Sequence, residues 1–153
     1  MGTKADLLHR YYTAMLNNQQ DWPAFEAFLR EHLAQDVQFE DFPFGNTAQD
    51  AGLVHVKRRS GVSEVIKLYE ELPKVVLFEQ FDLVRVVEGE EKAFAWLYIA
   101  GTATATGTKL ADEILLEWTF DSSGKIKGLR HWMDTKKHIE AFQPSVLKST
   151  SEP

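Results

Sequence analysis

The residues of this sequence that could do chemistry are carboxylates and a histidine set among apolar side chains. From Val37 the sequence alternates with a period of two, so that Asp41 shares one face of a predicted strand with Val37 and Phe39. A carboxylate is costly to bury on an apolar face, so its presence there indicates a function. Asp41 is therefore a candidate catalytic base, and the alternative is that it caps the turn at Phe42-Pro43.

A second carboxylate occupies a similar position in the strand predicted over Leu110–Asp121. The even-numbered residues of this strand form its apolar, inner face, and Asp112 shares that face with Ile114, Leu116, Trp118 and Phe120. We therefore expect Asp112 to act in catalysis, and Leu116 and Trp118 to contact a substrate. Asp112 could instead be an edge residue, or one half of an ion pair with Lys109.

The last predicted strand, from Lys125 to Thr135, adds a histidine to these acids. Two sets of residues alternate along it, and either set could face inward: Leu129, His131 and Met133, or Arg130, Trp132 and Asp134. His131 and Asp134 are candidate catalytic groups, and Met133 is a candidate substrate contact. His131 could also be a core or solvent-facing residue, and Asp134 could cap a final helix over Thr135–Phe142.

Aromatic residues are numerous enough to line a pocket around these groups, since the chain has 10 Phe, 4 Trp and 4 Tyr. Along the strand predicted over Lys92–Thr106, the even positions place Trp96 and Tyr98 on one face. We expect both rings to line the pocket together with Phe39 and Trp118. His55, at the end of a Gly- and Asn-containing loop that starts at Pro43, could close over a ligand. Apolar walls with a few polar groups are typical of ligand sites.

The elements that must position these residues are predicted from caps and periodicity. Thr3 and Asp6 form a capping-box pattern that starts a first helix. Asp21-Trp22-Pro23 starts a second helix, and Ser60 can cap a third that stops near Pro73. Strands are predicted from Val37, over Val75–Glu88 (one bent strand or two), Lys92–Thr106, Leu110–Asp121 and Lys125–Thr135. This order predicts an α+β fold with three helices over one curved antiparallel sheet.

Composition limits the alternatives. At 153 residues the chain is the size of one domain, which we place at 1–143 with a flexible tail at 144–153. The net charge of −6 argues against a nucleic-acid partner, and the absence of cysteine excludes disulfides and thiolate metal sites. We expect no metal, no cofactor, no membrane span and a cytoplasmic protein. The uncharged stretch Gly101–Thr106 predicts a homodimer through the outer sheet face.

Four short segments resemble a known superfamily: HRYYTAML, FEDFPFG, RRSGVSEVIKLY and TFDSSGKIKGLRHWMDT. From about Leu7 to Phe142 the chain resembles the SnoaL-like polyketide cyclases and the ketosteroid isomerases of the nuclear transport factor 2-like superfamily. The resemblance implies a cone-shaped sheet wrapped by three helices. It places Tyr11 at the isomerases' oxyanion-hole tyrosine and Asp41 at their general base, although Tyr11 could also be a core residue. Leu116 stands where the isomerases have a second oxyanion-hole acid, so a strict ketosteroid isomerase is not implied.

The chemistry predicted from these residues is proton transfer without a cofactor. Burial raises the pKa of a carboxylate and makes it a better base near neutral pH, while a tyrosine or imidazole can donate to a developing enolate oxygen. We therefore expect an isomerase or cyclase acting on a hydrophobic polyketide or terpenoid intermediate, the substrate type that the resemblance implies. The alternatives are a dehydratase, an epoxide hydrolase with an Asp–Arg–Asp set that uses Arg85 or Arg130, and a non-catalytic binding or dimerisation domain.

Overall fold

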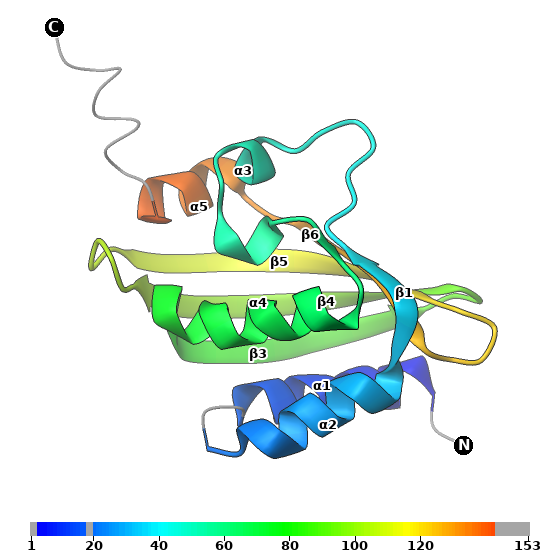
Figure 1. Cartoon of the computed structure of the whole chain (residues 1–153). Coiled ribbons are helices and arrows are strands. Elements are labelled where there is room, and N and C mark those ends of the chain that lie inside the picture. Colours follow the sequence, from blue (N-terminus) through cyan, green and yellow to red (C-terminus); the bar gives the residue numbers. More distant parts are fainter. Residues whose placement is uncertain (1–2, 18–19, 143–153) are drawn as a thin grey trace, which may run out of the picture.

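A strongly curved sheet of six strands, in the order β2-β1-β6-β5-β4-β3, is the frame of the molecule (Figure 1). The computed structural model describes residues 3–17 and 20–142, so the tail predicted over 144–153 lies outside them. The strands are β1 (Leu33–Phe39), β2 (Arg59–Ser60), β3 (Val76–Glu88), β4 (Lys92–Ala103), β5 (Lys109–Phe120) and β6 (Ile126–Trp132). The fold is α+β, as the sequence predicts.

Strand pairing is antiparallel except at one point, where β1 runs parallel to β6. This pairing brings Phe39, at the end of β1, level with Leu129 of the last strand. β3 is one strand with two register shifts, between Phe78 and Gln80 and between Leu83 and Arg85. Such irregularities bend a strand and increase its twist, which curls the sheet around the helices.

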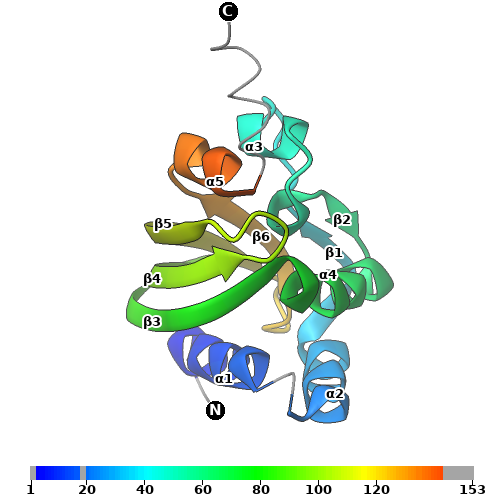
Figure 2. The same ribbon diagram turned by 90° about the vertical axis from the view of Figure 1, so that its left-hand side faces the viewer.

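Three long helices, α1 (Lys4–Leu16), α2 (Trp22–His32) and α4 (Val62–Val75), cover the concave side of the sheet (Figures 1 and 2). The capping box of Thr3 and Asp6 starts α1, as expected. The third helix differs from the prediction: its N-cap is Gly61, with φ of 87°, while Ser60 belongs to β2. None of the helices in the described part of the chain is long and apolar enough to span a membrane.

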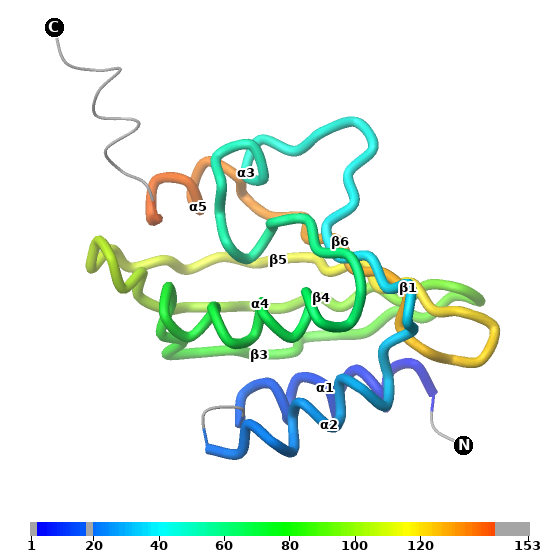
Figure 3. Tube along the Cα trace, in the orientation of Figure 1, coloured from blue at the N-terminus to red at the C-terminus, as the bar shows by residue number. Residues whose placement is uncertain are grey.

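The segment after β1 is an ordered insertion. It contains the short helix α3 (Thr47–Asp50) and the 3-10 turn η1 (Val54–Val56), and it lies beside the final helix α5 (Thr135–Phe142) (Figure 3). Ala48, Leu53 and Val56 are buried in a small separate core, and α5 packs against it with Ile139 and Phe142. The insertion is therefore held by its own apolar contacts.

Strand faces agree with the prediction for β5 and disagree for β4. Asp112, Ile114, Leu116, Trp118 and Phe120 are all buried on the inner face of β5. In β4 the inner residues are Ala93, Ala95, Leu97 and Ile99, so the expectation that Trp96 and Tyr98 point inward is wrong. The register explains this: Leu97 pairs with Ile114, and paired residues share a face. The register depends on the intervening turn, which periodicity within one strand cannot reveal.

The outer sheet face carries an apolar groove, lined in part by Val87, Trp96, Leu115 and Trp132. The four side chains are 39–54% exposed. The Gly101–Thr106 stretch does not provide such a surface, because Gly101 and Ala103 are buried and 104–106 form a turn. The homodimer remains a prediction, and its interface moves to this groove.

We expect the wild-type protein to sediment as a dimer at micromolar concentration. Trp96→Glu should shift it to a monomer, because the substitution places a charge at the centre of the apolar groove. His9→Glu, on the exposed face of α1, is the matched control and should leave the dimer intact. A wild-type protein that sediments as a monomer would contradict this prediction.

Candidate active site

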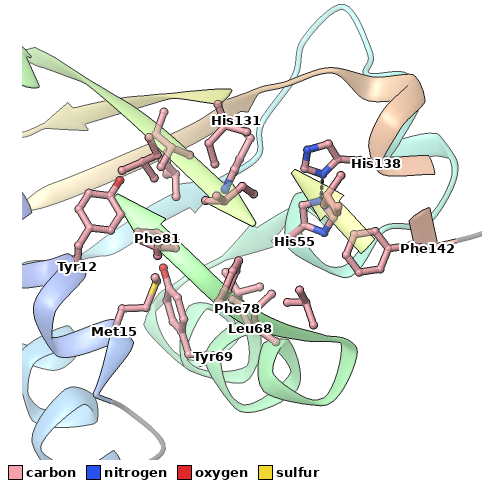
Figure 4. Close-up of a pocket in the computed structure, with 18 of the residues that line it drawn as sticks. Tyr12, Met15, His55, Leu68, Tyr69, Phe78, Phe81, His131, His138 and Phe142 are labelled. Carbon is pink, nitrogen blue, oxygen red and sulfur yellow. Dashed lines mark hydrogen bonds between the residues drawn. The ribbon is translucent and has the colours of Figure 1, made fainter. Parts of the chain in front are cut away.

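The candidate site is a cavity inside the cone, between α1, α4, α5 and the inner sheet face (Figure 4). Its volume is about 70 Å³. Most of its lining is aliphatic or aromatic: Met15, Leu68, Leu72, Val76, Phe78, Phe81, Leu97, Ile99, Leu110, Ile114, Leu116, Trp118, Leu129 and Phe142. Within the described ranges 3–17 and 20–142, five lining residues carry a hydroxyl or an imidazole: Tyr12, His55, Tyr69, His131 and His138. The chemistry of the cavity must come from these few groups.

A buried carboxylate, that of Glu40, orients one of the histidines. The Glu40 carboxylate is 1% exposed and contacts Nδ1 of His131 through Oε1. Its Oε2 accepts a hydrogen bond of 3.1 Å from the His131 backbone N–H. A carboxylate at Nδ1 favours the tautomer with hydrogen on that nitrogen, which leaves the Nε2 lone pair for a ligand. His131 therefore has the arrangement of a general base.

Glu40 reaches this position through an unusual backbone conformation. Its φ is 62°, a left-handed value that non-glycine residues rarely adopt, and its N–H donates to Leu129 O at 2.7 Å. The turn reverses the alternation at the end of β1, so that Glu40 points inward. Asp41, the predicted base, is instead exposed and lies 3.6 Å from Arg58. The expectation that Asp41 shares the inner face with Val37 and Phe39 is therefore wrong, because a period of two does not extend through a left-handed residue.

The tyrosine that lines the cavity is also the neighbour of the one that the resemblance indicates. Tyr11 is fully buried among aromatic rings and forms a hydrogen bond with the Tyr69 hydroxyl, but it does not line the cavity. Tyr12 does line it, and its hydroxyl oxygen accepts a 2.9 Å bond from Trp118 Nε1. Burial raises the pKa of Tyr12 well above its usual value, so its hydroxyl stays protonated and can donate.

Asp112 is buried as expected, and its carboxylate orients a histidine of α5. Its Oδ2 accepts from Nε2 of His138 at 2.8 Å and from the Asp134 backbone N–H at 3.2 Å. His138 Nδ1 lies 3.0 Å from Nε2 of His55. Asp134 is exposed and accepts from Lys137 N, so it caps α5 and has no place in the cavity.

The remaining predicted contacts divide into two groups. Trp118, Leu116 and His55 line the cavity. The others lie outside it: Phe39 is buried in the main core, Trp96 and Tyr98 are on the outer strand face, and Met133 borders the outer groove. Sequence reasoning missed Glu40, Tyr12 and His138. For His138 a signal existed, because it recurs at helical spacing with Ala141 and Phe142.

Access to the cavity also differs from the expectation. The position of His55 in the loop that starts at Pro43 suggests an entrance on that side, but packing with α5 occupies it, and the His55 and Phe142 rings lie 5.1 Å apart. A second hollow of about 160 Å³ adjoins the cavity at the ends of α1 and α4. The two share four lining residues: Met15, Leu72, Val76 and Phe78. A ligand that enters there displaces flexible side chains, above all Met15.

Two kinds of site find no support in the described residues. The arginines considered for a water-activating set lie elsewhere, because Arg85 is exposed on β3 and Arg130 binds Glu117 at 2.9 Å. Among residues 3–17 and 20–142, no group of three or more His, Asp or Glu side chains is arranged to hold a metal ion.

The buried imidazoles make stability depend on pH. Burial and the neighbouring histidines lower the pKa of His55 well below 6.5, and burial lowers that of His138. Below pH 6.5 the unfolded chain therefore binds protons that these two rings in the folded protein do not bind, and acid destabilises the fold. The loss approaches about 1.4 kcal/mol per pH unit for each ring.

We expect His55→Gln to reduce this loss by about 1 kcal/mol between pH 7.5 and pH 5.5, as measured by denaturant unfolding. His9→Gln, at an exposed position on α1, should leave the pH dependence unchanged. Equal slopes for wild type and His55→Gln would show that the His55 ring takes up a proton inside the folded protein.

Comparison with known proteins places this geometry in a fold family. No protein-family model matches the sequence, and no similar sequence was found among curated proteins. Solved structures do match. A nuclear transport factor 2-like protein from Burkholderia thailandensis E264 superposes with a TM-score of 0.70 at 18% identity, over 94% of this chain and 100% of that one.

Two further structures carry names that refer to chemistry. A protein proposed to be a SnoaL-like polyketide cyclase, from Jannaschia sp. CCS1, has a TM-score of 0.68 at 10% identity, over 98% of this chain and 93% of that one. SalBIII, an epoxide hydrolase/cyclase-like enzyme with a role in pyran ring formation in the polyether salinomycin, has a TM-score of 0.61 at 14% identity, over 88% and 92%. At these identities the likeness concerns the fold, and the chain has the nuclear transport factor 2-like fold.

Proposed function

We propose that this protein is an isomerase or cyclase that moves a proton on a small hydrophobic carbonyl compound without a cofactor. The observation that carries the proposal is the buried Glu40–His131 pair at the wall of an otherwise apolar cavity. SnoaL-like and cyclase-like proteins among the structural neighbours support the same class of chemistry. A polyketide or terpenoid intermediate fits the apolar lining.

His131 is the base in this proposal. Glu40 holds Nδ1–H, so Nε2 can remove a proton next to the substrate carbonyl, and the imidazolium that forms stays paired with the carboxylate. The proton then returns to another atom of the substrate, which completes an isomerisation. Alternatively, the enolate attacks a second carbonyl of the substrate, which closes a ring, and the alkoxide that forms takes the proton back from His131.

Tyr12 is the donor to the substrate oxygen. Trp118 Nε1–H fixes the orientation of its hydroxyl by donating to the oxygen, and the hydroxyl hydrogen remains for the enolate. A neutral donor in an apolar cavity stabilises developing charge more strongly than it would in water. Tyr12 therefore takes the role that the sequence resemblance assigns to Tyr11.

The rival functions fit these observations less well. A hydrolase with an Asp–Arg–Asp set needs an arginine beside the cavity, and both arginines proposed for it lie away from the lining. A passive binding domain has no use for a carboxylate buried at 1% exposure against an imidazole, because desolvating that charge costs free energy.

The base is tested by exchange of α-hydrogens in deuterated water. Wild-type protein should catalyse exchange into cyclohexanone, followed by NMR, and His131→Gln should lower the rate about 10²–10⁴-fold. Glu40→Gln should lower it in the same range, because the amide no longer enforces the base tautomer. Asp41→Asn changes the neighbouring, exposed acid and is the matched control, with a rate equal to wild type. No exchange above background with the wild-type protein would refute the proposal.

The donor is tested by two adjacent tyrosines that differ only in position. Tyr12→Phe should lower the exchange rate about 10²-fold or more, the usual effect of removing one oxyanion donor. Tyr11→Phe should leave the rate intact and lower the free energy of unfolding by about 1–2 kcal/mol, because the Tyr69 hydroxyl loses its partner. A reversed pattern of rates would return the donor role to Tyr11.

A further inference from the structure

A second carboxylate–histidine set meets the cavity besides Glu40 and His131. It runs in one line from Asp112 on β5 through His138 on α5 to His55 on η1, with contacts of 2.8 Å and 3.0 Å. Asp112 is 7% exposed and His138 is 1% exposed. Figure 4 shows the His55 and His138 rings side by side, with His131 on the same side of the cavity. The mechanism proposed above makes no use of this set.

The two contacts that join Asp112, His138 and His55 fix the position of the hydrogen on each imidazole ring. The Asp112 carboxylate can only accept, so His138 carries its hydrogen on Nε2. Because burial keeps that ring neutral, its Nδ1 has a lone pair and must accept from His55 Nε2–H. His55 is neutral for the same reason, and its hydrogen is used in this bond. The nitrogen that remains, Nδ1 of His55, is therefore a hydrogen-bond acceptor.

His55 is also held in place by the backbone around it. Gln49 Nε2 donates to Glu40 O at 2.8 Å and to Val56 O at 3.0 Å, which ties the end of β1 to η1. Val56 is fully buried in the small core between the insertion and α5. His55 and the Glu40–His131 pair are thus fixed relative to each other, as two recognition groups for a single ligand must be.

The polar groups of the cavity now include two acceptors and a donor. His131 Nε2 and His55 Nδ1 accept, while the Tyr12 hydroxyl donates. We propose that the substrate of this site is a hydroxy ketone, whose hydroxyl group donates to His55 Nδ1 while its carbonyl oxygen accepts from Tyr12. This rests on the proposed function for the carbonyl and His131, and adds His55 as the residue that selects the hydroxyl. A site built to bind a hydroxyl discriminates against analogues that lack it.

The tautomers are tested first, without any turnover, by NMR of protein labelled with ¹⁵N-histidine. We expect His55 and His138 to carry hydrogen on Nε2 and His131 on Nδ1. Asp112→Ala should remove the fixed tautomer of His138 and His55. Asp112→Asn should preserve it, because the oxygen that accepts from His138 also accepts from Asp134 N–H, so the amide oxygen takes that place. A wild-type His55 with hydrogen on Nδ1 would overturn the proposal.

The selectivity is tested by binding of an isosteric pair, hydroxycyclohexanone and methylcyclohexanone substituted at the same carbon. Wild-type protein should bind the hydroxy compound about 3–10-fold more tightly, the effect of one hydrogen bond. His55→Phe should abolish or reverse this preference, and the matched control His9→Phe, on α1, should keep it. Equal binding of both compounds by wild type would overturn the inference even if α-hydrogen exchange is catalysed. The expected preference without exchange would support it and refute only the proposed function.

Discussion

The buried contact between Glu40 and His131 is the interaction on which the site depends. A carboxylate at 1% exposure is tolerated because it accepts from both the ring and the backbone of His131. That requirement imposes the left-handed backbone at Glu40, and the parallel pairing of β1 with β6 brings the two residues together. Local strain of this kind persists only where the surrounding structure enforces it. Here two hydrogen bonds of the Glu40 backbone do so: its N–H donates to Leu129 O, and its carbonyl oxygen accepts from Gln49 Nε2.

The elements were largely predictable because their signals are local. Neighbouring residues alone predicted three features that the structure confirms: the capping box at Thr3, Pro23 in the first turn of α2, and the period of two along β5. The short insertion elements α3 and η1 were not predicted, since four or three residues give no periodicity. The α+β fold class followed from the order of elements, and the family from the resemblance of four short segments. Solved structures at 18% identity agree with that fold.

The sequence predicted which segments form the candidate site, but not which residues of those segments face it. The FEDFPFG and HRYYTAML segments do reach the candidate site, yet through Glu40, which contacts His131, and Tyr12, which lines the cavity, in place of Asp41 and Tyr11. A single left-handed residue inverts which of two adjacent acids faces inward, and a helix turns each successive side chain by about 100°. The inner face of β4 likewise depends on pairing with β5. The residues that face the site therefore depend on backbone conformation and strand pairing, which a single sequence does not reveal.

The parallel pairing of β1 with β6 determines when the site can form during synthesis. Glu40 and His55 leave the ribosome before His131 and His138. The cavity therefore forms only when β6 pairs with β1. This pairing brings together Glu40 and His131, which are 91 positions apart in the sequence. Contacts this distant in sequence form late, because a large loop must close first. Until then, the nascent chain exposes Glu40 and part of the apolar concave wall, which β6 and α5 later cover.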